Sequence, residues 1–514
     1  MVAAGAEEGV VRNFGTGISM SQYVGMNYIG GFLPSRADFG SFNPVNEEPI
    51  GYFPQSTDAE IDEALVAAQK AFPLWKALSR VQRAEYFWRL AKLLESKVDY
   101  VAKAISLETG KSLNESKAEV IEALHMTQFC FGKGREPSGD IVASELPERD
   151  SYVIRKPKGV VAVIAPWNFP FAIGGFWCSG PSLLEGNTVV FKPSELTPMV
   201  GQITAELFQD AGFPPGVFSL LHGDGNVGEK IVRDERVAHI AFTGSAEVGK
   251  SIRIECAHSW HKTCSCEMGS KSAVMVFDDC DFDLAVSACV NSAFKLSGQL
   301  CVSAGRLLVQ RSVLEKFKER FLYEVGTAVA IDPFDTPLGV CSVAFGPLIS
   351  AKQKRRVQNY NDLVRSDPDA QVLFDGDKDG TMAGNGHFLR PFVYQAEWSD
   401  KPYLKQEVFG PHVAIIPFDT LEDAIRIYND TEYGLALGVI TNDFRTAREV
   451  RNRCDFGLGY WNGGSIAAES HNPFGGVKKS GNGWPSAAGM FDAITHKVAW
   501  SANHGGLSFP QGLK

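Results

Sequence analysis

The spacing of apolar residues predicts a layer of α-helices in the first third of the chain. In the first helix the apolar positions recur at steps of four, three and four residues, at Ile61, Leu65, Ala68 and Phe72. Asp58 stands where the N-cap of this helix is expected. A second helix is predicted where one face collects Ala84, Phe87, Trp88, Ala91 and Leu94; a third ends near Gly110, and a fourth covers about residues 114–131. We interpret these faces as structural.

From residue 159 onwards, short apolar runs alternate with helical segments. The predicted strands are 159–165, 187–192, 217–221 and 239–242, and the predicted helices are about 199–211 and 226–232. Strands that alternate with helices of this length indicate a parallel sheet with both faces covered. Ligands of such sheets bind beyond the carboxyl ends of the strands. Candidate site residues are therefore expected directly after these strands.

A second α/β region is predicted at about residues 270–479. It contains a helix over 282–296, a strand over 306–310 and a helix near 312–328. Two further segments, 149–158 and 493–502, are expected to be extended arms. They can pair with each other or with the sheet of another subunit.

Length, composition and charge narrow the class of protein. A chain of 514 residues, 44% apolar and 21% charged, is typical of a soluble globular protein with two or three domains. The net charge of −10 argues against a nucleic-acid or anionic-membrane partner. No apolar run reaches the roughly 18 residues of a membrane-spanning helix, and residues 1–12 do not resemble a secretory signal. Ten scattered cysteines indicate reduced thiols, so we expect a cytoplasmic protein.

Cys301 is the strongest candidate for a nucleophile. It lies in the joint between the predicted helix 282–296 and the predicted strand 306–310, with Gly298 and Gly305 on either side. Glycines in such a joint allow a substrate and a cofactor to approach the backbone closely. The alternative is a buried structural cysteine, which is the commoner role of a free thiol.

Two strand ends carry residues suited to a dinucleotide. Gly244 and Ser245 join a strand to a helix, where backbone N–H groups and a hydroxyl can face a pyrophosphate, although Ser245 is also a common type of N-cap. Lys192 and Glu195 close another strand. A carboxylate at this position suits ribose hydroxyls and disfavours a 2′-phosphate, which favours NAD over NADP while leaving NADP possible.

Two further residues suit acyl chemistry. Asn168 lies between Pro166 and Pro170 after the first predicted strand, where a stiffly held amide can donate to an oxyanion; the alternative is an Asx-turn. Glu267 follows an apolar strand, where burial would raise the pKa of its carboxyl and suit it to general-base catalysis. A capped or salt-bridged glutamate is the alternative.

Seven segments occur together in one order that resembles the NAD(P)-dependent aldehyde dehydrogenase superfamily. They are PWNFP (166–170), GNTVVFKPSE (186–195), FTGSAEVG (242–249), EMGSK (267–271), GQLC (298–301), EVFGP (407–411) and PFGGVKKSGNG (473–483). The resemblance runs from about residue 28 to 500. It implies that Cys301 is the nucleophile, Asn168 the oxyanion donor and Glu267 the general base.

The same resemblance implies a cofactor site and a fold. Lys192 and Glu195 would hold the adenosine ribose, Ser245 with Gly244 the pyrophosphate, and Glu407 and Phe409 the nicotinamide ribose, with Trp167 beside the cofactor. The implied fold is α/β: a Rossmann-type cofactor domain (1–138 and 160–269), a catalytic domain (270–479) and a small β oligomerisation arm (139–159 and 489–507). A homodimer or homotetramer is expected.

The chain departs from the family pattern at three places. Ser270 replaces a glycine and is expected to crowd the nicotinamide side. The stretch 171–180 is one residue longer than usual, and Cys178 stands there where lysine is common. Trp484 and Pro485 replace the usual acidic residue. None of these changes removes a proposed catalytic group.

Two metal-like patterns are weak. His258, His261, Cys264 and Cys266 fit no closed zinc spacing. The run from Asp375 to Gly380 starts like a calcium loop but has Gly386 at its twelfth position, so a polar hairpin loop is expected. No metal is predicted.

The substrate is predicted from aromatic residues near the proposed site. Phe169, Phe176, Trp177 and Phe474 indicate an apolar entrance for an uncharged aromatic or aliphatic aldehyde. A semialdehyde dehydrogenase, a CoA-acylating enzyme and a non-catalytic structural homologue are the alternatives. Glu267 argues against CoA acylation, because that reaction needs no water-activating base.

Overall fold

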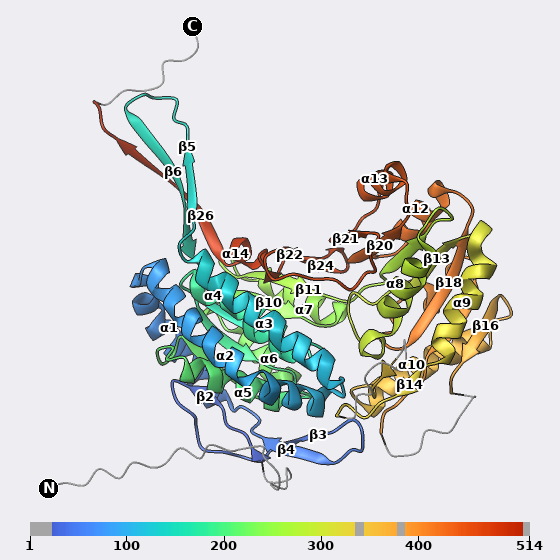
Figure 1. The fold of residues 1–514 in the computed structure, drawn as a ribbon. Coiled ribbons are helices and arrows are strands. Elements are labelled where there is room, and N and C mark those ends of the chain that lie inside the picture. The colour runs from blue at the N-terminus through green and yellow to red at the C-terminus, as the bar shows by residue number, and fades with distance from the viewer. Residues whose placement is uncertain (1–22, 335–343, 378–385, 507–514) are drawn as a thin grey trace.

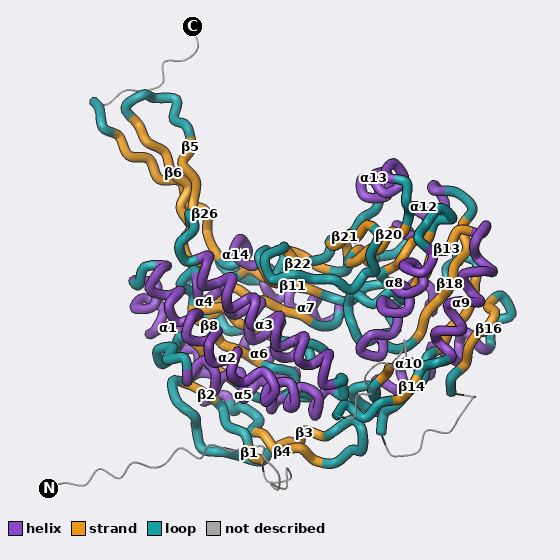
Figure 2. The backbone as a smooth tube through the Cα atoms, in the orientation of Figure 1, coloured by secondary structure: helices purple, strands orange, loops and turns teal. Residues whose placement is uncertain are grey.

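The computed structural model describes residues 23–334, 344–377 and 386–506, which form two α/β lobes and a projecting arm (Figure 1). Each lobe is built on a seven-stranded sheet, and a three-stranded sheet forms the arm. Figure 2 shows the strands of both lobes with helices around them. The predicted α/β fold class is confirmed.

The first sheet has the strand order β2-β9-β8-β7-β10-β11-β24. Its strands are β2 Tyr28–Ile29, β9 Phe218–Leu220, β8 Thr188–Lys192, β7 Val160–Ile164, β10 Val237–Thr243, β11 Thr263–Glu267 and β24 Gly481–Asn482. The five central strands are parallel. Chain order reverses between β7 and β10, so the loops after these two strands lie at the point where such sheets bind ligands.

Helices cover both faces of this sheet. One face packs against α1 Asp58–Ala77, α6 Gly225–Arg233 and α7 Ala246–Cys256. The other packs against α2 Arg80–Thr109, α3 Leu113–Lys133, α4 Ser179–Leu184 and α5 Pro198–Asp210. Because both faces are buried, the central strands are nearly continuous apolar runs, which is why the sequence pattern locates them to within two residues.

The N-terminal helices differ from the prediction in two respects. Thr57, not Asp58, is the N-cap of α1, and its hydroxyl forms a capping box with Glu60. Residues 80–109 form the single helix α2 instead of two helices, because no proline or glycine interrupts them before Gly110, which ends the helix with a φ of 73°. Trp88 was expected on the buried face but is 45% exposed.

The stretch after β7 forms a π-helix, Pro170–Cys178, which leads directly into α4. A π-helix has a wider turn than an α-helix, with i→i+5 hydrogen bonds, and commonly accommodates one additional residue. Such a turn is able to absorb the extra residue expected from the sequence, and β8 begins within one residue of its predicted start.

The second sheet has the order β16-β17-β18-β13-β12-β20-β21. Its strands are β16 Ala370–Asp375, β17 Phe392–Ala396, β18 His412–Phe418, β13 Arg306–Gln310, β12 Ala273–Val276, β20 Ala436–Ile440 and β21 Leu458–Trp461. Helices α8 Phe282–Phe294 and α9 Leu314–Gly326 cover one face. The other side carries α10 Ala351–Arg365, α11 Pro402–Lys405, α12 Leu421–Asn429 and α13 Phe444–Arg453.

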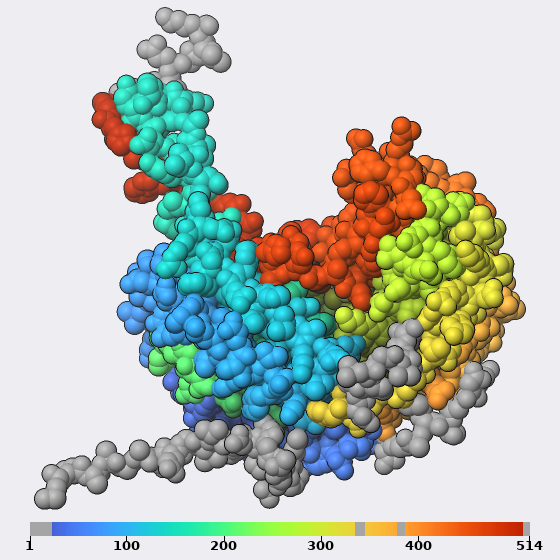
Figure 3. Space-filling view, viewed as in Figure 1, coloured from blue at the N-terminus to red at the C-terminus, as the bar shows by residue number. Residues whose placement is uncertain are grey.

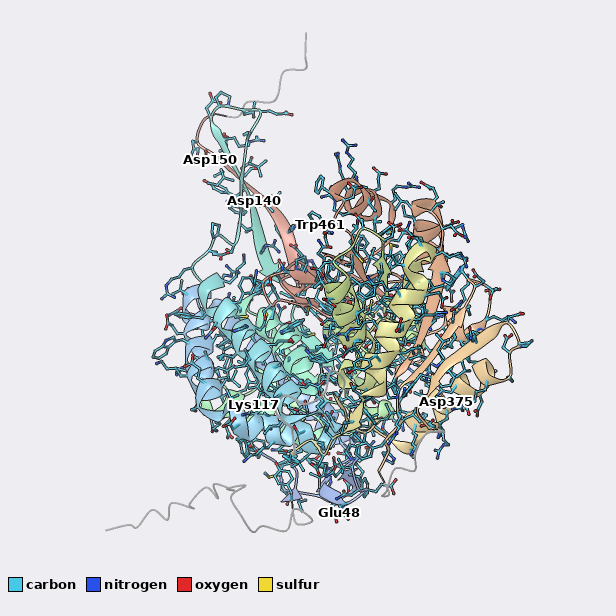
Figure 4. The ribbon with its side chains drawn as sticks, turned by 45° about the vertical axis from the view of Figure 1, so that its right-hand side comes forward. Glu48, Lys117, Asp140, Asp150, Asp375 and Trp461 are labelled. Atoms are coloured by element: carbon cyan, nitrogen blue, oxygen red, sulfur yellow. The ribbon has the colours of Figure 1, made fainter. Side chains whose placement is uncertain are left out.

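The arm is an antiparallel sheet of β5 Gly139–Val142, β6 Arg149–Pro157 and β26 Thr495–Asn503. Of the two pairings that the sequence left open, the structure has the one between the two extended segments, from Thr495 opposite Pro157 to Asn503 opposite Arg149. The arm stands clear of the body (Figure 3). Figure 4 labels Asp140 and Asp150 on the arm and Trp461 on β21, an edge strand of the second sheet.

Short elements complete the fold. They are β1 Tyr23–Val24, β3 Phe39–Phe42, β4 Pro49–Phe53, β14 Val329–Ala330, β15 Ala344–Phe345, β19 Tyr433–Gly434, β22 Pro473–Phe474, β23 Val477–Lys478, β25 Ser486–Ala487, α14 Met490–Ala493 and the 3₁₀ helices Lys295–Gly298 and Arg311–Val313. Within the described ranges, no helix combines the length and apolar character needed to cross a membrane. The nine cysteines of these ranges are free thiols.

Candidate functional site

Cys301 lies in a tight loop before β13, at the edge of the second sheet that faces the carboxyl ends of the first. The backbone enters this loop through left-handed conformations at Leu296, Ser297 and Gly298, with φ values of 53°, 54° and 70°. A Cβ atom at Gly298 would lie 2.2 Å from the carbonyl oxygen of Gly410. Glycine is therefore required here, as the sequence indicated, so that the two loops can touch.

Four successive backbone carbonyls of the Cys301 loop are held by hydrogen bonds. Gln299 accepts from Nδ2 of Asn168 at 2.9 Å, Leu300 from the N–H of Ser303 at 3.1 Å, Cys301 from the hydroxyl of Ser270, and Val302 from the hydroxyl of Ser465 at 2.6 Å. Three of these donors come from distant parts of the chain. The loop is thus fixed by residues of both lobes.

Asn168 is positioned by a buried carboxylate of α3. Glu119 accepts the backbone N–H groups of Phe171 and Ala172 at 2.8 and 3.1 Å, which satisfies the first turn of the π-helix that follows Asn168. The ammonium of Lys111 pairs with Glu119 and lies 3.9 Å from the centre of the Phe169 ring. The residues that directly follow Asn168 are therefore held in place by Lys111 and Glu119.

Glu267 ends β11 and is fully buried. Neither carboxylate oxygen has a regular hydrogen bond within the described residues. Burial raises the pKa of Glu267 well above its usual value, and the nearby backbone N–H of Gly476 opposes this shift. A carboxyl in this state can take up a proton at a pH where an exposed glutamate cannot.

Burial also raises the pKa of the Cys301 thiol, and the carboxylates of Glu267 and Glu407 raise it further. The backbone N–H groups of Cys301 and Val302 act in the opposite direction, because N–H dipoles beside the sulfur favour the thiolate. Ser270 ties these segments together: its N–H donates to Glu407 and its hydroxyl to the carbonyl of Cys301.

Glu407 and Phe409 bring a third loop to the site. Glu407 accepts the N–H of Ser270 at 2.7 Å, and burial raises its pKa to about 7. A Cβ at Gly269 would lie 2.2 Å from Oε2 of Glu407, so any other residue there would displace this carboxylate. Phe409 has a φ of 64°, and its ring lies edge-on to Trp167 with centroids 5.3 Å apart.

A cleft of about 370 Å³ lies between α6 and α7, at the carboxyl ends of the central strands β7 and β8. It is lined by Ile164, Lys192, Gly225, Gly228, Glu229, Val232, Arg233, Val248, Ser251, Ile252 and Glu255. The ammonium of Lys192 donates to the carbonyl of Pro193 at 3.0 Å and lies 3.6 Å from the carboxylate of Glu195. A buried lysine beside a half-exposed carboxylate fits a ligand that carries hydroxyl groups, as a ribose does.

The phosphate prediction needs a correction at Gly244. Its backbone N–H donates to the carbonyl of Glu267 at 3.0 Å, so it ties β10 to β11 and is not available to a pyrophosphate. Ser245 is the N-cap of α7 and accepts the N–H of Val248 at 3.4 Å. Its pyrophosphate role stays a prediction, because a capping serine keeps its hydroxyl hydrogen free to donate.

A second pocket, of about 70 Å³, opens onto Cys301. Phe169, Trp177 and Phe474 line it, as the sequence predicted. Phe176 does not line it. The Phe176 ring is buried between Phe171 and Phe208, with centroids 4.7 and 5.8 Å away, because neighbouring residues of a helix point in different directions.

Two charged residues of this pocket were missed by the sequence reasoning. Glu122 of α3 and Lys295, just after α8, both line it. Burial and the charge of Glu119 raise the pKa of Glu122 to about 7. Helix 114–131 was interpreted as structural, and nothing in its periodicity shows that one of its polar positions faces a nucleophile far along the chain.

The departures from the family pattern contact other parts of the site. Cys178 and Pro485 meet: the thiol donates to the Pro485 carbonyl at 3.2 Å and lies 3.7 Å from the Ser486 hydroxyl. Uncharged groups therefore surround residue 178 on this side, where the family pattern would pair a lysine with an acidic residue. The Ser270 hydroxyl, expected to crowd the nicotinamide side, donates instead to the carbonyl of Cys301.

The metal-like patterns do not form metal sites in the described parts of the chain, where no group of three or more histidine, cysteine or acidic residues could hold an ion. The Cys264 thiol contacts Cys256 and Cys266, and His261 lies 2.9 Å from the carbonyl of Glu235. Asp375 pairs with Arg365 at 2.7 Å. Residues 378–385 of the calcium-like run lie outside the described residues.

Known proteins resemble this chain over nearly its whole length. Residues 32–498 match the aldehyde dehydrogenase family. An α-ketoglutaric semialdehyde dehydrogenase of Bacillus subtilis (strain 168) is 32% identical over 441 residues, which is 85% of this chain and 89% of that protein. The crystal structure of betaine aldehyde dehydrogenase from Staphylococcus aureus in complex with NAD+ superposes with a TM-score of 0.87, at 28% identity, covering 95% of this chain and 96% of the other.

Proposed function

The chain belongs to the aldehyde dehydrogenase family, and from this premise we propose that it oxidises an aldehyde to the carboxylic acid with Cys301 as nucleophile. The observation that carries this proposal is the convergence of Cys301, Asn168 and Glu267 from three separate segments. NAD is the proposed cofactor, because Glu195 lies beside Lys192 at the edge of the first sheet. NADP is the alternative.

Attack by the Cys301 thiolate on the aldehyde carbon gives a thiohemiacetal whose oxyanion needs hydrogen-bond donors. One N–H of the Asn168 amide holds the carbonyl of Gln299, and the second remains to donate. The backbone N–H of Cys301 is a further donor. In a dry site each such donor contributes about 3–4 kcal/mol to stabilising the developing charge.

The cofactor residues of this chain orient the reaction. A bound nicotinamide would supply the acceptor for the hydride that leaves the thiohemiacetal carbon, so that Cys301 would carry a thioester. Lys192 and Glu195 would hold the adenosine ribose, Glu407 and Phe409 the nicotinamide ribose, and Ser245 the pyrophosphate. Trp167 supports Phe409 through their ring contact.

Glu267 would then release the product. Its buried carboxylate takes a proton from water, the resulting hydroxide attacks the thioester carbon, and the acid leaves as the Cys301 thiolate is restored. This base favours hydrolysis over transfer to CoA. Because the general base works in its ionised form and burial raises the pKa of Glu267, deacylation should accelerate as the pH rises.

The substrate we propose is an uncharged aromatic or aliphatic aldehyde. Phe169, Trp177 and Phe474 give the pocket an apolar wall next to Cys301. A second class, semialdehydes with a distal carboxylate, is favoured by one observation, that the exposed Lys295 lines the same pocket. The Bacillus subtilis relative is named for such a substrate.

A substrate panel tests the proposal. Purified protein is mixed with benzaldehyde, hexanal or succinic semialdehyde and with NAD or NADP, and reduced cofactor is followed by absorbance with and without CoA. We expect CoA-independent turnover with NAD, and kcat/KM for the two uncharged aldehydes above that for the semialdehyde. Preference for the semialdehyde, abolished by Lys295→Ala, would establish the second class instead. Strict dependence on CoA would contradict hydrolysis, and no reduction with any aldehyde would contradict the enzyme assignment.

We propose that residues 139–159 and 489–507 form an oligomerisation arm beside a cofactor domain of residues 1–138 and 160–269 and a catalytic domain of residues 270–479. Ile141 and Trp500 support this role for the arm, because their side chains are 86% and 62% exposed on a sheet that stands away from the body. Apolar side chains of this size on an exposed sheet are typical of an interface. A homodimer or homotetramer is the proposed assembly, and the free thiols support a cytoplasmic location.

Replacing both Ile141 and Trp500 by serine should shift the protein to a smaller assembly, since the arm would lose its exposed apolar contacts. Light scattering after gel filtration measures the mass. Leu74→Ser, at a 75% exposed position on α1 outside the arm, is the matched control and should leave the mass unchanged. An unaltered mass in the double variant would exclude the arm as the interface.

A further inference from the structure

Ser270 joins the Cys301 loop to the Glu407 loop. It is 4% exposed. Its N–H donates to Glu407 at 2.7 Å, and its hydroxyl donates to the carbonyl of Cys301. The oxygen of the same hydroxyl lies 2.9 Å from Oγ of Ser272. A hydroxyl has one hydrogen, so Ser272 is the donor in that last contact. The Ser270 hydrogen is thus committed to the nucleophile's own carbonyl.

The carbonyl of Cys301 and the N–H of Val302 belong to one planar peptide unit. That N–H lies beside the Cys301 sulfur, where it lowers the pKa of the thiol. A hydrogen bond to the carbonyl end of a peptide polarises the unit, which makes its N–H a stronger donor. The hydroxyl also fixes the plane of the peptide, so the direction of the N–H no longer depends on the loop alone.

We propose that Ser270 is a positioning residue for the nucleophile: its hydroxyl holds the Cys301–Val302 peptide so that the Val302 N–H is aimed at the sulfur and stabilises the thiolate. This inference rests on the proposed role of Cys301. Glycine, which the family pattern has at this position, offers no hydroxyl. The hydrogen bond is therefore supplied by this chain's own departure from the pattern.

The loop provides a matched control one peptide further on. The Ser465 hydroxyl donates to the carbonyl of Val302 at 2.6 Å, so Ser465→Ala removes a hydrogen bond of the same kind from the same loop. The peptide it holds ends in the N–H of Ser303, which donates to the carbonyl of Leu300 and not to the sulfur. Loss of this bond can loosen the loop, but it leaves the polarisation of the Val302 N–H, which faces the Cys301 sulfur, unchanged.

The experiment measures alkylation of Cys301 by iodoacetamide across a pH series. The thiolate displaces iodide to give the carbamidomethyl thioether, so the rate follows the ionised fraction. Trypsin releases residues 296–306 as a peptide with Cys301 as its one cysteine, and mass spectrometry of this peptide excludes signal from the other nine. Variants Ser270→Ala, Ser270→Gly, Ser270→Thr and Ser465→Ala are compared with the unaltered protein.

We expect Ser270→Ala and Ser270→Gly to shift the alkylation midpoint upward by about 0.5–1 pH unit, which lowers the rate at pH 7 about three- to tenfold. Ser270→Thr keeps a hydroxyl and should keep the original midpoint. The KM for NAD should stay unchanged in Ser270→Ala, because the backbone N–H that binds Glu407 remains. Thermal unfolding of each variant shows whether it is folded.

An unchanged midpoint in Ser270→Ala would overturn the proposal, and so would an equal shift in Ser465→Ala, since that result means general loosening of the loop. Failure of the proposed function gives a different result. In that case either the unaltered protein oxidises no aldehyde or Cys301→Ser oxidises aldehydes as fast as the unaltered protein, whatever the alkylation midpoints of the Ser270 variants.

Discussion

Cys301→Ser is expected to lower aldehyde oxidation by about 10⁴-fold or more, the largest effect of any single substitution in this protein. Serine keeps the shape of the loop, but its hydroxyl ionises at far higher pH than a thiol and forms no thioester. The structure adds a specific reason: burial and the charges of Glu267 and Glu407 already raise the pKa of the thiol. A hydroxyl in this setting would stay neutral. Steady-state reduction of NAD with an aldehyde measures the loss.

Cys280→Ser is the matched control, since Cys280 is a partly exposed cysteine of the same lobe that does not line the Cys301 pocket. It should retain activity within about twofold, as surface substitutions away from a site usually do. Iodoacetamide should inactivate the unaltered protein in proportion to labelling of the 296–306 peptide. Activity of Cys301→Ser within tenfold of the original would contradict the assignment of the nucleophile.

Glu267→Gln is expected to separate acylation from turnover. The first reduction of NAD should still appear as a burst equal to the active-site concentration, because forming the thioester needs no activated water. Steady turnover should fall about 10²–10⁴-fold, the usual contribution of a general base. Rapid mixing with an aldehyde and NAD measures both phases. The increase of turnover with pH that Glu267 confers should also disappear.

The same variant should change Cys301 in the opposite direction. The carboxylate of Glu267 raises the pKa of Cys301, so removing its charge should move the midpoint of Cys301 alkylation to lower pH. If Glu267 instead deprotonated the thiol, alkylation would slow. Glu122→Gln is the control, because Glu122 is another pocket carboxyl with a raised pKa and should not affect steady turnover after the burst. Normal turnover in Glu267→Gln would refute the base.

The strands of the first sheet were predictable because each is buried on both faces. Apolar runs such as Val160–Ile164 are a local property of the chain, and their carboxyl ends lead directly to Asn168 and Lys192. The single helix formed by residues 80–109 was harder to predict from the sequence. Apolar faces that drift around a long helix resemble two shorter helices, and only the absence of a break, visible in α2, distinguishes the two.

Side-chain surroundings were harder to predict than elements. Phe176 and Trp177 are neighbours with the same aromatic character, yet one is in the core and the other in the pocket. The N–H of Gly244, which the sequence pattern offers to a phosphate, donates to the carbonyl of Glu267 instead. Glu122 lines the pocket although its helix, α3, was interpreted as structural from the sequence. In each case the deciding neighbour is distant in sequence.

By itself, the sequence determined which reactive groups exist and in what order. A thiol between glycines, an amide between prolines and a carboxylate after a strand are local patterns, and their order along the chain identified the family. Only the tertiary structure decided the burial, the charges and the hydrogen-bond partners around these groups. The pKa of Glu267, the donors around Cys301 and the hydrogen bond from Ser270 depend on burial and on distances of a few ångströms between residues far apart in the chain, and no local pattern encodes these.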